Sequence, residues 1–124
     1  MRFRKAGWLC LNSKDRLVLK KIRDHIEAIL RYCRDCKDFQ QFQSNSMLVE
    51  ATVFNLMQIG ELSKAALSDE AKMQFSSIPW TQLYGMRNRI VHGYAGVNMN
   101  IVWDTIQMDL PKLLEDLQQD SADE

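Results

Sequence analysis

The sequence is poor in the residues that interrupt helices, because it contains 2 prolines and 5 glycines among 124 residues. No segment alternates apolar and polar residues with the period of two that indicates a β-strand. No uncharged apolar run is long enough to cross a membrane, and the apolar patch at residues 7–11 is too short for a secretory signal. These absences exclude strand-rich and membrane-spanning proteins, and they predict a cytoplasmic, all-helical protein.

Cysteine and histidine are also scarce, with 3 and 2 copies. An odd number of cysteines argues against a disulfide framework. Cys33 and Cys36 have the spacing of a metal or redox pair, but no second pair accompanies them, so packing at a helix end explains them better. No Glu-x-x-His pair is present, which disfavours a di-metal helical bundle. We therefore expect no metal site and no cofactor.

The net charge is zero, yet the charges are unevenly distributed along the chain. Residues 1–37 contain 11 basic and 4 acidic residues, whereas residues 38–124 contain 5 basic and 12 acidic residues. A basic first helix can attract phosphate groups locally even in a neutral protein. Alternatively, this helix pairs with the acidic remainder of the chain. The sequence leaves both interpretations open.

Four long segments have the apolar pattern of helices. Apolar residues recur at spacings of three and four in the first segment, residues 13–35, and in the last, residues 98–118. Residues 46–67 are apolar on more than one side, which is typical of a helix packed on two sides or at a dimer contact. A further long helix is expected at residues 79–92. Together they predict an all-α, antiparallel bundle of four to five helices.

The segments between these helices are short. Residues 37–45 are expected to form a loop or a short helical turn, and residues 69–74 one helical turn within a connection. Because no linker-like stretch divides the chain, we expect one helical domain at residues 13–119. Residues 1–12 are interpreted as an N-terminal extension and residues 120–124 as a flexible tail.

Several residues predict where the helices begin and end. Ser13 is the predicted N-cap of the first helix, with Arg16 in place of the acid that would complete a capping box. Pro79 suits a first helical turn because its ring fixes φ and it has no N–H. Gly93 is expected to end that helix in a left-handed conformation. Pro111 lies inside the last apolar pattern, so a kink or a break is expected there.

The segment from Tyr84 to Tyr94 concentrates side chains that can do chemistry. Asn88 and His92 are four residues apart and share a helix face, whereas Arg87 and His92 are about 140° apart around the axis. A guanidinium can stabilise charge that develops on a phosphate, and an imidazole can accept or donate a proton. Cleavage of an RNA phosphodiester is therefore one interpretation of this segment.

One histidine cannot easily act as both base and acid, but two copies facing each other across a dimer axis would supply both. The alternative is a structural cluster, in which His92 caps the helix end and Arg87 and Arg89 pair with acidic neighbours. Tyr94 would then pack at a corner. The spacing of these residues does not decide between the two interpretations.

Five segments of the sequence resemble the HepT-like family of the HEPN superfamily. They are residues 55–61 (NLMQIGE), 78–80 (IPW), 85–94 (GMRNRIVHGY), 101–104 (IVWD) and 109–111 (DLP). The similarity extends over roughly residues 15–117, and the segment 85–94 is far more specific than an arginine and a histidine at a fixed spacing.

This resemblance implies a HEPN fold and a homodimer in which the motif helices meet at the interface. It implies metal-independent RNA endonuclease activity with Arg87 and His92 as catalytic residues, and Asn88 fills the polar position after the arginine. It also implies a toxin–antitoxin pair, in which a partner nucleotidyltransferase of the MNT type adenylylates Tyr94 and so neutralises the toxin.

Glu61 is the remaining candidate for the site. It lies on the same side of its predicted helix as Phe54 and Met57, and an acid in an apolar stripe is costly unless it is paired. We expect Glu61 either to orient Arg87 or to form a structural ion pair.

The sequence leaves two alternatives to a ribonuclease toxin. One is a non-catalytic module that binds nucleotides or a nucleotidyltransferase. The other is a plain dimerisation bundle.

Overall fold

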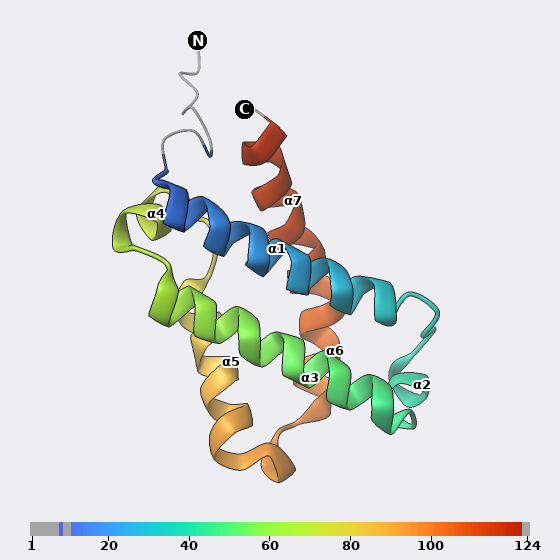
Figure 1. Ribbon diagram of the computed structural model, residues 1–124. Coiled ribbons are helices and arrows are strands. Elements are labelled where there is room, and N and C mark those ends of the chain that lie inside the picture. Colours follow the sequence, from blue (N-terminus) through green and yellow to red (C-terminus); the bar gives the residue numbers. More distant parts are fainter. Residues whose placement is uncertain (1–7, 9–10, 123–124) are drawn as a thin grey trace.

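The computed structural model describes residue 8 and residues 11–122. Its helices are α1 (Ser13–Tyr32), α2 (Phe39–Gln43), α3 (Ser46–Glu61), α4 (Asp69–Gln74), α5 (Trp80–Gly93), α6 (Met99–Asp104) and α7 (Leu110–Ala122). In this part of the chain all regular structure is helical, so the predicted all-α bundle is confirmed. α1 and α3 run antiparallel and side by side, α3 packs on α5, and α7 packs on α1 (Figure 1). None of the described helices is both long and apolar enough to cross a membrane.

The predicted apolar stripe of α1 forms one wall of the core. Leu19, Ile22, Ile26 and Ile29 are completely buried. Their spacings of three and four place them on one side of the helix, toward α3 and α7. Burying one such side chain contributes about 1.5–3 kcal/mol relative to leaving it exposed. The stripe therefore accounts for most of the contribution of α1 to the core.

The start of α1 differs from the prediction. Its N-cap is Asn12, whose Oδ1 accepts a hydrogen bond from the N–H of Asp15 at 2.7 Å, so the prediction of Ser13 as N-cap is wrong. Most of the predicted extension at residues 1–12 lies outside the described residues. Trp8 and Leu11, however, are buried in the core, so packing begins before residue 13.

The end of the last helix also differs from the prediction. α7 continues to Ala122, into the segment expected to be a flexible tail. Residues 123–124 of that segment lie outside the described residues.

Two of the predicted helices contain π-helical turns. Leu62–Ala66 follows α3 within the predicted helix at residues 46–67, and Thr105–Asp109 separates α6 from α7. The second turn ends two residues before Pro111, which has no N–H to donate and whose ring would clash with the carbonyl of Gln107 in a regular helix. A wider turn relieves that clash, and the predicted break near Pro111 is confirmed.

α5 carries the segment that the sequence analysis singled out. It begins at Trp80, one residue later than predicted, with Pro79 as its N-cap. The Nε1–H of Trp80 donates to two carbonyl oxygens at the end of α4, at 3.2 and 3.3 Å. The prediction of a left-handed Gly93 is wrong, because its φ is −171° and the chain continues into a 3₁₀ turn at Tyr94–Gly96.

The two segments that connect α1 to α3 and α3 to α5 each contain a short helix, as expected. α2 lies within residues 37–45 and is capped by Asp38, whose Oδ1 accepts a hydrogen bond from the N–H of Gln41 at 2.9 Å. α4 coincides with the turn predicted at residues 69–74 and is capped by Ser68.

Asp15 joins the start of α1 to the start of α4. The residue is only 3% exposed. Its Oδ1 accepts a hydrogen bond from the backbone N–H of Ser68 at 3.0 Å, and its Oδ2 accepts one from the Ser68 hydroxyl at 2.6 Å. Hydrogen bonds of this kind compensate the cost of burying a carboxylate. They hold the N-terminus of α1 against the segment that follows α3.

We expect Asp15→Ala to lower the free energy of unfolding by about 3–6 kcal/mol, because it removes two hydrogen bonds to a charged group and each contributes about 1.5–3 kcal/mol. Urea denaturation followed by circular dichroism measures this loss. Asp35→Ala is the matched control, because Asp35 is exposed, and its effect should stay within about 0.5 kcal/mol. Equal effects of the two substitutions would contradict the assigned role of Asp15.

Candidate functional site

α3 and α5 approach each other closely at Gly60. A Cβ at this position would lie 2.5 Å from the Cβ of Arg87 and 2.7 Å from the carbonyl oxygen of Leu83. Any side chain here would therefore push α5 away from α3, and only glycine permits the contact. Sequence analysis did not identify Gly60 as a site residue. The one feature of the sequence that could have pointed to Gly60 is its position directly before Glu61.

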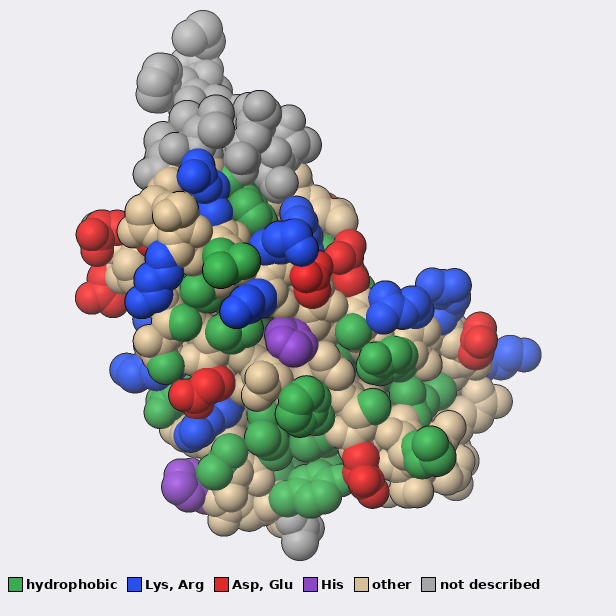
Figure 2. Space-filling model, in the orientation of Figure 1, with side chains coloured by type: hydrophobic (Ala, Val, Ile, Leu, Met, Phe, Trp, Pro, Cys, Tyr) green, Lys and Arg blue, Asp and Glu red, His purple; other side chains and the backbone are tan. Residues whose placement is uncertain are grey.

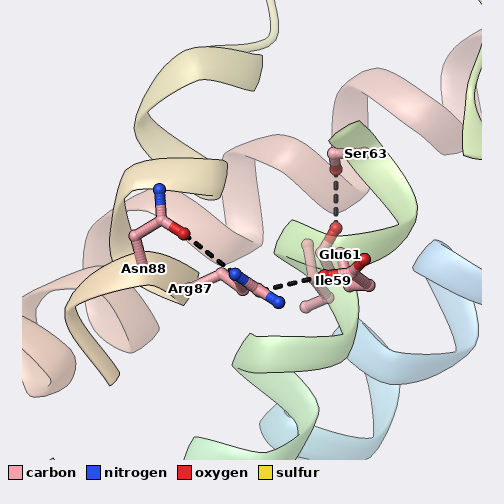
Figure 3. Close-up of polar contacts among 5 residues, drawn as sticks. All are labelled: Ile59, Glu61, Ser63, Arg87 and Asn88. Atoms are coloured by element: carbon pink, nitrogen blue, oxygen red, sulfur yellow. Dashed lines mark hydrogen bonds and ion pairs between the residues drawn. The ribbon is translucent and has the colours of Figure 1, made fainter. Parts of the chain in front are cut away.

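Arg87 lies between α5 and α3, where two polar side chains hold its guanidinium (Figure 3). Its Nε is 2.9 Å from Oε2 of Glu61, and its Nη1 donates to Oδ1 of Asn88 at 2.9 Å. The prediction that Glu61 pairs with a basic residue is confirmed, and that residue is Arg87. Among the described residues, the other N–H groups of the guanidinium have no partner, so they can bind an anion.

Tyr84 brings a second cation close to Arg87. The guanidinium carbon of Arg87 is 5.8 Å from the centre of the Tyr84 ring, and the Nζ of Lys64 is 5.4 Å from it. Lys64 belongs to the π-helical turn at Leu62–Ala66 and is exposed. Because Glu61 compensates the charge of Arg87, Lys64 adds positive charge that no described residue neutralises. No pattern in the sequence indicated Lys64.

His92 and Tyr94 lie at the far end of the same helix. His92 is in the last turn of α5 and Tyr94 begins the following 3₁₀ turn, and both are exposed. Within residues 11–122, no hydrogen bond or ion pair joins either of them to Arg87. The structure therefore brings Glu61, Arg87 and Asn88 together, and it leaves His92 and Tyr94 accessible at the C-terminal end of α5 without joining them to this group.

The two arginines of the motif are directed to different sides of α5. Arg87 contacts α3, whereas Arg89 is exposed and lines a groove of about 620 Å³ that α5 forms with α6, α7 and the π-helical turn between them. Arg89 forms no ion pair with a described residue. In the structural interpretation of this segment, Arg87 and Arg89 both pair with acidic neighbours. The structure shows such a pair for Arg87 and none for Arg89 among the described residues.

The cysteines contribute to packing. Cys33 is buried at the end of α1, with its Sγ 3.6 Å from the hydroxyl oxygen of Thr52. Burial raises the pKa of the Cys33 thiol, and burial together with the nearby Asp35 and Asp38 raises the pKa of Cys36. A raised pKa lowers the fraction of thiolate, which is the reactive and metal-binding form.

Cys10 lies outside the described residues. Within the described part of the chain, no group of three or more histidine, cysteine, aspartate and glutamate side chains is arranged to hold a metal ion.

Comparison with protein families and comparison with individual proteins both find similarity to ribonucleases. The family described as ribonuclease HepT-like matches residues 22–119 of the chain. "Putative RNase TTE0752" of Caldanaerobacter subterraneus subsp. tengcongensis is 35% identical over 101 residues, which cover 77% of this chain and 89% of the relative. "Probable ribonuclease HepT" of Thermococcus cleftensis is 32% identical over 95 residues, which cover 77% and 84%. No solved structure matches the chain.

We expect Gly60→Ala to lower the free energy of unfolding by about 1–3 kcal/mol, because the added methyl group overpacks the contact between α3 and α5. Gly85→Ala is the matched control, since Gly85 lies in α5 and a Cβ there meets nothing within 4 Å. It should raise the free energy of unfolding by about 0.5–1 kcal/mol, as expected for alanine in place of glycine in a helix. Urea denaturation of both variants tests the pair. Similar stabilities would show that the helices do not meet closely at Gly60.

Proposed function

The chain belongs to the ribonuclease HepT-like family, and from this membership we propose that it is the toxin of a toxin–antitoxin pair, an RNA endonuclease that needs no metal ion. The observation that carries this proposal is the guanidinium of Arg87, which Glu61 and Asn88 fix at the surface. The exposed imidazole of His92 follows about 7.5 Å farther along the same helix. Because the two side chains are about 140° apart around the axis, the proposal requires that bound RNA or a second copy of the chain brings an imidazole to the phosphate at Arg87.

The proposed reaction uses the RNA's own 2′-hydroxyl as the nucleophile. The imidazole of one His92 accepts the 2′-hydroxyl proton while the bond between O2′ and phosphorus forms. The bond between phosphorus and O5′ breaks, and the imidazolium of the second protomer's copy of this histidine donates a proton to O5′. The guanidinium of Arg87 stabilises the charge that develops on the phosphoryl oxygens. The products are a 2′,3′-cyclic phosphate and a 5′-hydroxyl, so no co-reactant is required.

This mechanism needs two histidines and hence a homodimer. An exposed apolar stripe on α3 supports that assembly. Met47 is 82% exposed and Phe54 is 55% exposed, and these residues and Glu61 follow one another at intervals of seven, which places them on one side of the helix. Apolar side chains gather on this face below the band of α1 (Figure 2). A second copy packed on the stripe would also cover the edge of the Arg87 site.

We expect Arg87→Ala and His92→Ala each to reduce RNA cleavage by at least about 100-fold, because they remove charge stabilisation and proton transfer. The assay uses purified protein, unmodified at Tyr94, and single-stranded RNA in the presence of EDTA. Arg89→Ala and His25→Gln are the controls, since each changes the same kind of residue outside the site, and both should retain cleavage.

Two results would count against this function. RNA binding without any cleavage by the wild-type protein would favour the non-catalytic module. Unchanged cleavage in both Arg87→Ala and His92→Ala would remove the assigned active site.

We further propose that a nucleotidyltransferase of the MNT type neutralises the toxin at Tyr94. The Tyr94 side chain is 45% exposed, so its hydroxyl is accessible to a second enzyme. Its Oη would attack the α-phosphorus of ATP, forming an ester bond and releasing pyrophosphate. The attached AMP carries a negative charge close to Arg87 and His92, where it would occupy the phosphate site and exclude RNA.

Tyr94→Phe should remain toxic to growing cells even when the active partner enzyme is present, because phenylalanine offers no hydroxyl for modification. Mass spectrometry should detect AMP on the wild-type protein and none on Tyr94→Phe. Tyr32→Phe is the matched control, because Tyr32 is also 45% exposed, and it should be modified and neutralised like the wild type. Rescue of growth by the active partner in Tyr94→Phe would contradict this mechanism of neutralisation.

A further inference from the structure

α1 and the turn that follows it carry a concentration of positive charge. The basic side chains exposed on this part of the surface, which we name the α1 basic surface, are Lys14, Lys20, Lys21, Arg31, Arg34 and Lys37. The acidic residues of the same stretch are Asp15, Asp24, Glu27 and Asp35, of which Asp15 is buried and bound to Ser68. The α1 basic surface therefore has a clear positive excess, although the whole chain is neutral.

In the part of the chain that the structure describes, these cations do not pair with the acidic residues that follow α1 and α2. Lys20 pairs with Asp24 of the same helix at 3.2 Å, and the guanidinium of Arg31 lies 5.4 Å from the ring centre of its neighbour Tyr32. Arg23 lies over the Trp8 ring, has a further contact and is only partly exposed, so it does not belong to this surface. Within the described residues, no member of the α1 basic surface forms an ion pair with α3 to α7. Of the two interpretations that the sequence left open, the structure favours the attraction of phosphates.

The α1 basic surface adjoins the helices that carry the candidate site. α1 packs along α3, and α3 packs on α5, which carries Arg87. Because α1 and α3 are antiparallel, the N-terminal half of α1 lies beside the end of α3 where Glu61 is found, and the contact between Asp15 and Ser68 fixes that arrangement. Lysine and arginine side chains follow the band that α1 occupies in Figure 1 (Figure 2).

The dimensions of α1 suit an extended polyanion. A helix of 20 residues is about 30 Å long, which is enough for several successive phosphates of a single strand. Lys14 and Lys21 are seven residues apart and therefore lie on one side of the helix, and both are exposed. Lysine side chains bind phosphates as mobile point charges without reading bases, so this surface would bind RNA without regard to its sequence.

We propose that the α1 basic surface binds the RNA backbone beside the scissile phosphate. This inference rests on the proposed function, because it assumes that RNA is the substrate of the Arg87 site. In this arrangement Arg87 and His92 act on one phosphodiester, whereas Lys14, Lys20 and Lys21 hold phosphates of the flanking nucleotides. Such contacts are equally strong in the ground state and the transition state, so they determine KM more than kcat.

The test compares two double substitutions that remove the same charge from different surfaces. Lys14→Gln/Lys21→Gln alters the α1 basic surface, and Lys72→Gln/Lys112→Gln alters α4 and α7. Both are made in the His92→Ala protein, so that single-stranded RNA is bound and not cut, and fluorescence anisotropy is measured over a range of salt concentrations. We expect the α1 variant to weaken binding about three- to tenfold and to reduce the salt slope by up to about 1.4, since each phosphate contact on a single strand contributes about 0.7. The control variant should keep the slope of the parent protein.

A second measurement uses proteins with His92 intact. Lys14→Gln/Lys21→Gln should raise KM for RNA cleavage by a similar factor and leave kcat unchanged. Lys14→Arg/Lys21→Arg keeps the charges and should restore both the salt slope and KM. Because these side chains are exposed, circular dichroism should show the same fold in all variants.

The remaining outcomes distinguish this inference from the proposed function. Equal weakening by the two double substitutions would mean that only net charge matters, and it would overturn the role of α1. Normal RNA binding by Lys14→Gln/Lys21→Gln together with weakened binding of a protein partner would assign the surface to that partner and also overturn it. If wild-type protein neither binds nor cleaves RNA, the proposed function fails and this inference fails with it. If cleavage requires His92 but is insensitive to Lys14 and Lys21, this inference alone fails.

Discussion

The contact between α3 and α5 at Gly60 determines where the guanidinium of Arg87 lies. Because Gly60 has no side chain, the Cβ of Arg87 packs directly against the backbone of α3, and its Nε reaches the carboxylate of Glu61. An arginine that is free in solution loses about 2 kcal/mol of rotamer entropy when it is fixed. Here part of that entropy is lost on folding, so less remains to be lost when an anion binds. The absence of a side chain at Gly60 on α3 thus helps to fix the position of the Arg87 guanidinium on α5.

The ion pair that orients Arg87 also weakens the attraction that Arg87 exerts on distant anions. At physiological ionic strength exposed charges are screened beyond about 8 Å, and a neutral pair attracts a polyanion weakly at any range. Arg87 is therefore suited to act at short range, on charge that develops in the reaction. Attraction over longer distances has to come from cations without an acidic partner among the described residues, such as Lys64, Lys14 and Lys21. Short-range stabilisation of charge and long-range attraction of anions therefore come from side chains on different elements of the structure.

The features that sequence reasoning predicted correctly are local. The buried stripe of α1, the turn at residues 69–74 and the break near Pro111 depend on residues within a few positions of each other. The cap of α1 was misplaced because Asn12 and Ser13 are both good caps, and only the geometry decides which one reaches the N–H of N3. The left-handed Gly93 was wrong because glycine permits that conformation without requiring it.

The contact of Gly60 with Arg87 joins residues far apart in the sequence, so it depends on how two helices pack, which spacing within one helix does not determine. The residues that fold the protein are therefore largely distinct from those proposed to act on RNA. Gly60 and Asp15 are buried between elements, whereas His92 and Tyr94 are exposed at the end of α5. A group as bulky as AMP can be attached to an exposed tyrosine on a 3₁₀ turn without repacking the core. The proposed modification of Tyr94 is thus compatible with an intact fold, and its removal would require no refolding.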